Sequence, residues 1–279
     1  MRYPAKNKPR ILTVCIIFSI VLGMFFYGVG VGEFHWPPYG LLHSLTKGLS
    51  DGFERVSSLQ QTDGASYDIQ TWRTSYYALD NEGQLLLEEL FPYRNEMVYT
   101  FNRLVNPQKT AIVVMDPWID SPSEELNIDY EVIIVNRIIP VVEKGIELGH
   151  PIIVLTNSSL NRAYSNQIHP YLNRLVKESC VYLLYHEEYD DREFAAFLRR
   201  IGVTSLIYTG FASNLCVIGR PMGIIHMVNN GFRCFSIPEA SAAVEFENTW
   251  DTGAIHEMTT KIIAQWMAEI ININEFLSL

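Results

Sequence analysis

Short apolar runs alternate with amphipathic stretches along the second half of the chain. Each run is a few residues long, is rich in β-branched side chains and is bounded by polar or turn-forming residues. Continuous apolar runs of this length are typical of strands buried on both faces of a parallel sheet. We therefore predict strands at residues 110–116, 151–157, 180–186, 204–210 and 231–240.

Helical periodicity fills the gaps between these runs. In residues 191–202 apolar side chains recur at the spacing i, i+3, i+4, i+7, which places them on one helix face. Residues 136–150, with Pro140 in the first turn, and residues 252–270 also predict helices. Strands and helices that alternate in this way predict a doubly wound, mainly parallel α/β sheet with helices on both faces.

The N-terminal region has a different pattern. Residues 11–32 contain no charged side chain, and a stretch of this length crosses a hydrocarbon core of about 30 Å as a transmembrane helix. Several basic residues precede it in residues 1–10, so the positive-inside rule predicts that this segment is cytoplasmic and that the rest of the chain lies outside the cytoplasm. A cleaved signal peptide is the alternative, because small residues around Gly30 resemble a cleavage site.

Residues 33–108 give a weaker pattern. They predict either a linker or an extra N-terminal layer on the folded domain. Strand-like runs flank the sequence DNEG at residues 80–83, which predicts a hairpin turn. The main domain is expected at residues 109–279.

Composition limits the classes of function. The net charge is −10 and no block of Lys or Arg follows residue 10, which argues against a nucleic-acid partner. The four cysteines lie far apart and form no C-x-x-C pair. This pattern does not match a zinc signature, and it is too sparse for a disulfide scaffold.

Two reactive side chains follow predicted strands. Asp116 ends the first strand of the main domain, and Cys216 comes a few residues after the strand at 204–210, where we expect a helix to begin. Pockets in such sheets open at the carboxyl ends of strands, so both residues are expected on one rim. A helix start favours the thiolate of Cys216, and Asp116 is a candidate general base. The alternatives are a buried apolar role for Cys216 and a loop cap for Asp116.

The segments TAIVVMDPW, NRIIPVVEKGIELGHPIIVLTN and LIYTGFASNLCVIGRPMGIIHMVNNGFRCFSIPEASAA follow one another in the order seen in isochorismatase-like cysteine hydrolases. The chain resembles this family over about residues 109–270. In the family the cysteine is the nucleophile and the strand-end aspartate is its base, so the resemblance implies these roles for Cys216 and Asp116. It also implies a cis peptide bond between Phe211 and Ala212, and an isochorismatase-like hydrolase domain at residues 109–279.

One family residue is missing from this chain. Members of the family usually have a lysine at the end of the third strand, where this sequence has Tyr185 and His186. His186 is a candidate proton carrier, because histidine titrates near neutrality. The alternative is that it is a polar residue that closes the strand. Lys177 belongs to the preceding predicted helix and would open toward the wrong end of the strand.

Further candidates border the expected rim. Small residues after the strand at 204–210 allow backbone N–H groups to approach a developing oxyanion. Aromatic side chains there are candidates for the walls of an apolar pocket, or for core or dimer contacts. Arg220 is interpreted as part of a kink, with carboxylate binding as the alternative, and His226 and His256 as ordinary polar residues on helices. The expected oxyanion and substrate-binding set is Phe211, Ala212, Ser213, Asn214 and Trp118.

These patterns predict a membrane-anchored cysteine hydrolase that cleaves a C–N bond of a small amide or ureide. Its partners would be a small-molecule substrate and the lipid bilayer at residues 11–32, with homo-oligomerisation left open. Metal-using relatives carry an Asp-x-His arrangement that this chain lacks, so we expect no metal and no cofactor. The alternative is a catalytically impaired domain that binds a small ligand or a partner, because the family lysine is absent.

Overall fold

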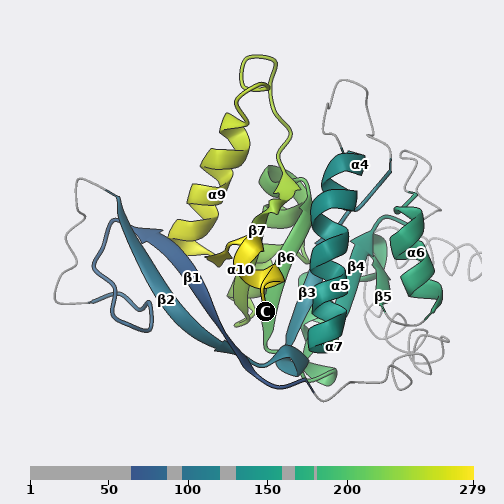
Figure 1. The fold of residues 1–279 in the computed structure, drawn as a ribbon, viewed down its shortest axis with the longest axis horizontal. Helices are drawn as coiled ribbons and strands as arrows, with labels where there is room; N and C mark the ends of the chain where they lie inside the picture. The colour runs from purple at the N-terminus through teal and green to yellow at the C-terminus, as the bar shows by residue number, and fades with distance from the viewer. Residues whose placement is uncertain (1–63, 87–95, 120–129, 159–166, 179–180) are drawn as a thin grey trace, which may run out of the picture. The chain divides into compact units, whose positions relative to one another are not determined.

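The computed structural model describes residues 64–86, 96–119, 130–158, 167–178 and 181–279, which build one eight-stranded sheet flanked by helices (Figure 1). The strand order is β2-β1-β8-β7-β6-β3-β4-β5. The predicted cytoplasmic segment at 1–10 and the predicted transmembrane helix at 11–32 lie outside the described residues. Within the described ranges, no helix is long and apolar enough to cross a membrane.

Five parallel strands form one side of the sheet, from β7 to the edge strand β5, at the places that the apolar runs predict. All six residues of the first of them are buried, as expected for a strand covered on both faces. The bounds are β3 Thr110–Met115, β4 Ile152–Thr156, β5 Tyr182–Tyr185, β6 Ser205–Phe211 and β7 Arg233–Ala242.

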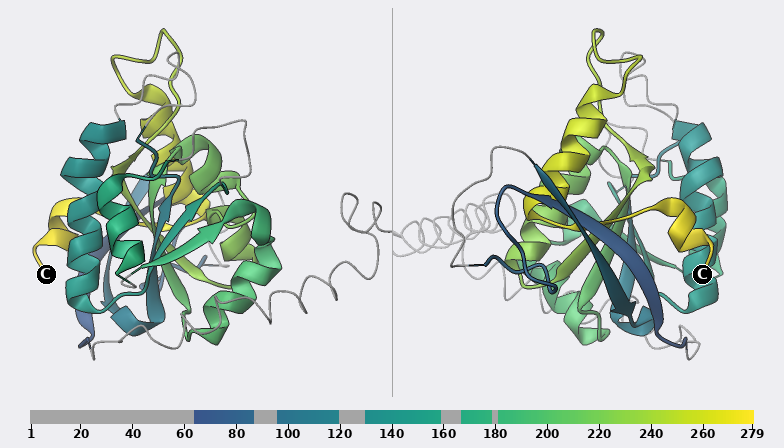
Figure 2. Two further views of the ribbon diagram at one scale, coloured as in Figure 1. Left: turned by 90° about the vertical axis from the view of Figure 1, so that its right-hand side faces the viewer. Right: turned by 60° about the vertical axis from the view of Figure 1, so that its left-hand side comes forward.

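Helices cover both faces of this sheet, which confirms the predicted α/β layering (Figure 2). One face packs against α5 Ile139–Leu148, α6 Pro170–Lys177 and α10 Ile273–Leu277. The opposite face is covered by α7 Asp191–Arg200 and α8 Ile224–Asn229. The helix α9 Ala254–Trp266 packs near β1.

The helix predicted at 136–150 begins earlier than its sequence pattern indicates. Helical backbone starts at α4 Tyr130–Ile133 and continues through a π-turn, η3 Ile134–Ile138, into α5. Pro140 lies in the first turn of α5, as predicted, directly after the π-turn. A proline has no N–H, so it cannot donate the helical hydrogen bond of its position. The wider π-turn just before Pro140 is where the helical run adjusts to this missing bond.

Three strands that the sequence did not clearly predict extend the sheet at one edge. The hairpin of β1 Tyr67–Ser75 and β2 Met97–Val105 joins the sheet through β8 Glu269–Ile271, with β1 antiparallel to both neighbours. The predicted turn at 80–83 is present, since Gly83 N–H donates to the Asp80 carbonyl at 3.0 Å. Strands β1, β2 and β8 therefore widen the sheet. The helix predicted at 252–270 is too long, because its last residues belong to β8.

The carboxyl ends of β3 and β6 meet closely. Met115 pairs with Gly210 at this end of the sheet. A Cβ on Gly210 would lie 2.1 Å from the Met115 carbonyl oxygen, and the residue has φ 97°. Only glycine fits both the close approach and the left-handed backbone. This contact brings the residue after each strand to the same rim.

Candidate active site

Asp116 follows β3 directly and is held in an unusual backbone conformation. Its φ is 44°, in the left-handed region that aspartate tolerates better than most residues do. The Asp116 N–H donates to the Leu155 carbonyl and its carbonyl accepts from the Trp118 N–H, each at 2.8 Å. The residue is 1% exposed. These bonds fix the carboxylate on the rim rather than leaving it in a mobile loop.

Cys216 is positioned by a sharp change of direction after β6. The peptide bond between Phe211 and Ala212 is cis, as the family resemblance implies. A five-residue π-turn, η5 Ser213–Val217, then carries Cys216. The carbonyl of Ala212 accepts hydrogen bonds from the Leu215 and Val217 N–H groups. These two N–H groups are therefore already hydrogen-bonded, so they are not available to bind an oxyanion.

His186 contacts Asp116, so the two predicted partners share one site. His186 begins a short helix, η4 His186–Glu188, at the carboxyl end of β5. Its Nε2 lies 2.8 Å from Asp116 Oδ1, and the two side chains are 4% and 1% exposed. A carboxylate only accepts, so Nε2–H donates to it. Neither Asp116 Oδ2 nor His186 Nδ1 has a hydrogen-bond partner among the described residues.

Arg220 also belongs to this cluster and contacts the sulfur of Cys216. It lies four residues after Cys216, and its Nε donates to Cys216 Sγ at 3.4 Å. Burial raises the pKa of the Cys216 thiol to about 11, the charge of Asp116 adds to the rise, and Arg220 opposes it. On the sequence pattern alone, a helix start is expected to favour the thiolate. The turn that carries Cys216 has only five residues, and burial together with the charge of Asp116 raises the thiol pKa on balance.

Tyr130 also faces this cluster, and the sequence analysis missed it. Burial raises its pKa to about 12, with further contributions from the charges of Asp116 and Cys216. The ring packs edge-on against Phe211 at 4.5 Å between centroids. Nothing in the sequence around Tyr130 indicates this role, since it precedes the predicted helix. For Arg220, in contrast, the spacing of four residues from Cys216 is a usable signal.

The predicted substrate-binding residues have mixed outcomes. Phe211 is 1% exposed and belongs to the hydrophobic core, where its ring packs against Tyr130. Trp118 is 7% exposed and its Nε1–H donates to Thr156 Oγ1 at 2.8 Å. Asn214 exchanges two hydrogen bonds with the backbone of Val244, at 3.0 and 3.2 Å. Asn214 thus ties the turn to the loop after β7, in line with an orienting role.

Ser213 is engaged by a histidine from α9. Its Oγ lies 3.0 Å from His256 Nδ1, while His256 Nε2 lies 3.1 Å from the Pro238 carbonyl. Because a carbonyl only accepts, Nε2–H donates to it and the Ser213 hydroxyl donates to Nδ1. Burial lowers the pKa of His256, which agrees with this neutral form. The Ser213 hydroxyl is therefore not free to bind an oxyanion.

Two further observations concern alternatives for the site. Lys177 is the last residue of α6, ahead of β5, as the sequence predicts. Among the described residues, no group of three or more His, Cys, Asp or Glu side chains is placed to hold a metal ion. The cluster that the structure brings together is Asp116, His186, Cys216 and Arg220, with Tyr130 beside it.

Comparisons with known proteins give similarities at low identity. No family model matches the chain, and no curated protein matches it. Among solved structures, an isochorismatase from Pseudomonas putida KT2440 is 18% identical over 61% of this chain and 91% of that chain, with a TM-score of 0.47. A cysteine hydrolase from Pseudomonas syringae pv. phaseolicola 1448A is 17% identical over 62% and 93%, with a TM-score of 0.46. The nicotinamidase PncA from Bacillus subtilis is 16% identical over 59% and 99%, also with a TM-score of 0.46.

Proposed function

We propose that this chain is a cysteine hydrolase of the isochorismatase-like kind, which cleaves a C–N bond of a small amide or ureide. The observation that carries the proposal is the arrangement at the rim. A buried carboxylate, Asp116, has one oxygen held by His186 and the other without a partner among the described residues. Cys216 lies in the electrostatic field of that carboxylate. This is a nucleophile with an adjacent base whose orientation is fixed by a third group.

The proposed reaction uses Asp116 Oδ2 as the proton carrier. As Cys216 Sγ bonds to the substrate carbonyl carbon, the thiol proton moves to Asp116 and the carbonyl oxygen becomes an oxyanion held by backbone N–H groups. The C–N bond then breaks, and Asp116 returns the proton to the leaving nitrogen. Water attacks the resulting thioester while giving a proton to Asp116. The C–S bond breaks and the thiol is regenerated with that proton.

In this proposal, His186 acts on the carboxylate of Asp116 and Arg220 acts on the sulfur of Cys216. His186 donates to Asp116 Oδ1, which leaves Oδ2 to accept the proton from the thiol. Arg220 donates to Sγ and stabilises negative charge on it. The raised pKa of Cys216 means that the resting residue is a thiol, so proton transfer accompanies attack rather than preceding it.

The test is a hydrolysis assay on a panel of small amides and ureides, in which the released ammonia is measured. We expect Cys216→Ser to abolish turnover, and Asp116→Asn to lower it by about 10²–10⁴-fold, because general acid–base catalysis is worth that much. Lys177→Ala is the matched control and should keep wild-type turnover. His186→Ala separates two versions of the mechanism: a large loss assigns it the place of the family lysine, and no loss leaves a two-group site.

Wild-type turnover in Cys216→Ser would contradict the proposal. If the wild type hydrolyses nothing in the panel, the alternative gains support, namely a descendant of the family that binds a small ligand or a partner. The observation in its favour is His186 at the carboxyl end of β5, where the family has a lysine.

Anchoring of the domain is proposed on the sequence alone. Residues 11–32 would span the membrane, with residues 1–10 in the cytoplasm and the domain outside it. A reporter that is active only in the cytoplasm, fused after Leu279, should give little signal. The same fusion without residues 1–32 is the control and should be active. Strong signal from the full chain would reverse the orientation.

A further inference from the structure

A cleft lies at the other end of the sheet from Cys216. It has a volume of about 240 Å³ and is bordered by the hairpin turn, the start of β7 and the segment between α9 and β8. Strand β6 pairs with Arg233 at its start and with Ala242 at its end, and Cys216 follows that end. Seven residues of strand span roughly 20 Å, so the cleft is separate from the candidate active site.

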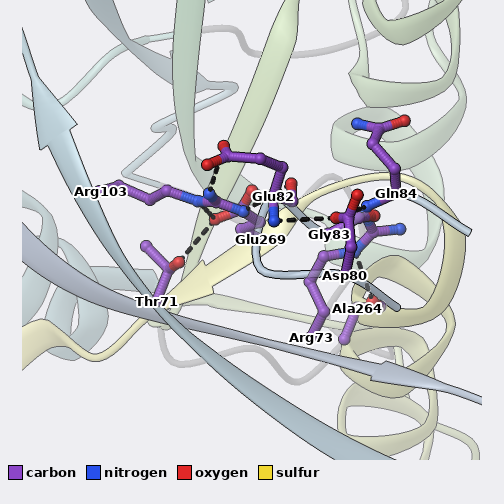
Figure 3. A network of polar contacts seen from close by, with 9 residues as sticks. All are labelled: Thr71, Arg73, Asp80, Glu82, Gly83, Gln84, Arg103, Ala264 and Glu269. Atoms are coloured by element: carbon purple, nitrogen blue, oxygen red, sulfur yellow. Dashed lines mark hydrogen bonds and ion pairs between the residues drawn. The ribbon is translucent and has the colours of Figure 1, made fainter. Parts of the chain in front are cut away.

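A buried carboxylate with a spare oxygen borders this cleft. Glu269 Oε2 accepts from Thr71 Oγ1 at 2.5 Å and from Arg103 Nε at 2.8 Å (Figure 3). The Glu269 side chain is only 8% exposed. Both contacts end on Oε2, and Oε1 accepts no hydrogen bond from the described residues while it keeps some contact with solvent. A carboxylate oxygen in this situation can accept a hydrogen bond from a ligand donor.

Guanidinium groups in the cleft lack carboxylate partners of their own. Arg73 donates only to backbone carbonyls, at 3.3 Å to Gly83 and 3.5 Å to Ala264 (Figure 3) and at 3.2 Å to Gln265. Burial lowers the pKa of Arg73, and the charge of Glu269 opposes this. Arg233, which also lines the cleft, makes no side-chain hydrogen bond or ion pair with any residue that the structure describes.

Two arginines, Arg73 and Arg233, and two carboxylates, Glu82 and Glu269, line the cleft. Arg103 is not part of the lining but pairs with both carboxylates, so the whole group carries an excess of one positive charge. A ligand with a single negative charge balances this set, whereas a phosphate dianion would be repelled by the two carboxylates.

The rest of the wall is apolar. Trp266 is 55% exposed although it lies beside the cleft, and Phe232 forms part of the lining. Indole and phenyl faces bind flat apolar groups well, and the volume suits a ligand of one ring rather than a larger cofactor.

We propose that this cleft binds a small organic monocarboxylate with an aromatic or apolar body and a hydrogen-bond donor. Its carboxylate binds Arg233, its donor bonds to Glu269 Oε1, and its body lies against Trp266. The site is independent of the chemistry proposed at Cys216.

The probe is 4-hydroxybenzoate, titrated into the full-length protein by calorimetry. We expect saturable binding at one site, at least tenfold tighter than that of the uncharged 4-hydroxybenzamide, because the amide lacks the charge that Arg233 recognises. Benzoate, which lacks the hydroxyl donor, should bind several-fold more weakly than 4-hydroxybenzoate. Arg233→Gln should weaken 4-hydroxybenzoate binding by tenfold or more. Arg192→Gln, at an exposed arginine of α7 outside the cleft, is the matched control and should bind as the wild type does.

Cys216→Ser separates this site from the candidate active site and should leave 4-hydroxybenzoate affinity unchanged. Loss of binding in that variant would assign the carboxylate to the other rim and overturn the proposal. Equal affinity for the acid and the amide would overturn it as well, as would equal behaviour of the two arginine variants. Benzoate binding as tightly as 4-hydroxybenzoate would refute the contact with Glu269.

Discussion

Replacing Asp116 by asparagine should make Cys216 more reactive toward an alkylating agent while it lowers hydrolysis by about 10²–10⁴-fold. Burial and the charge of Asp116 both raise the thiol pKa, to about 11. Asparagine keeps the shape of the side chain and removes its charge, so the thiolate becomes easier to form. Hydrolysis falls in the same variant because the proton carrier is gone. The two readouts therefore move in opposite directions.

The magnitude follows from the thiolate fraction. At pH 7.5, a pKa of about 11 leaves roughly one thiol in 3,000 ionised, whereas a pKa of about 9 leaves roughly one in 30. Wild-type Cys216 should thus react with iodoacetamide about 100-fold more slowly than an ordinary thiol does. Asp116→Asn should accelerate the reaction at least tenfold, which corresponds to about 1.4 kcal/mol. Arg220→Gln should slow it, because the cation that opposes the rise is lost.

The assay is the second-order rate of iodoacetamide labelling between pH 6 and 10, with the Cys216 peptide quantified by mass spectrometry. Peptide mapping is needed because the chain has four cysteines. Cys234 is 3% exposed and serves as an internal unreactive control. The wild-type rate should still rise at pH 10 without a plateau. A plateau below pH 9, or slower labelling in Asp116→Asn, would refute this account of the site's electrostatics.

Three further predictions concern stability, each measured by urea unfolding. Burial lowers the pKa of His150 from 6.5 to about 4, so between these pH values the unfolded chain binds a proton that the native state does not. The free energy of unfolding should therefore fall by about 3 kcal/mol as the pH drops from 6.5 to 4 and stay level above pH 7. The His150→Gln variant should not show this fall. Gly210→Ala should cost well over 2 kcal/mol because its Cβ meets the Met115 carbonyl, whereas Gly202→Ala, with φ 81° and open space, should cost only about 1 kcal/mol; equal costs would contradict the steric argument. Arg103→Met should cost about 3–5 kcal/mol by leaving Glu269 buried without its cation, and a cost below 1 kcal/mol would show that the pair is not desolvated.

The central strands and the rim could be predicted because their signals are local. A continuous apolar run such as residues 110–115 has few alternatives to a buried strand, and the residue that follows it must lie at the carboxyl edge. His186 follows β5 in the same way, which is why a polar residue at a strand end could be assigned to the site. The sequence pattern decided these positions without knowledge of the whole fold.

The sheet edge could not be predicted, because its signals are not local. Strand β8 has three residues, and they continue the helical periodicity of α9, so only their pairing with β7 and with β1 identifies them as a strand. The bond between Thr71 and Glu269 joins residues 198 positions apart. Neither residue has a motif that marks it. The cleft depends on these contacts and was therefore absent from the sequence analysis.

The histidine at the end of β5 has a physical consequence for the proposed mechanism, because a lysine in its place would act differently. A single ammonium group can contact a carboxylate and a thiol together, and it would stabilise both as anions. In this chain His186 contacts only Asp116, and Arg220 approaches the thiol from a separate turn. The cation beside sulfur therefore has to offset both burial and the carboxylate, and the raised thiol pKa shows that it does so only in part. In the proposed mechanism, such a site favours substrates whose leaving nitrogen accepts a proton readily, because the proton held by Asp116 must leave before the thioester can form.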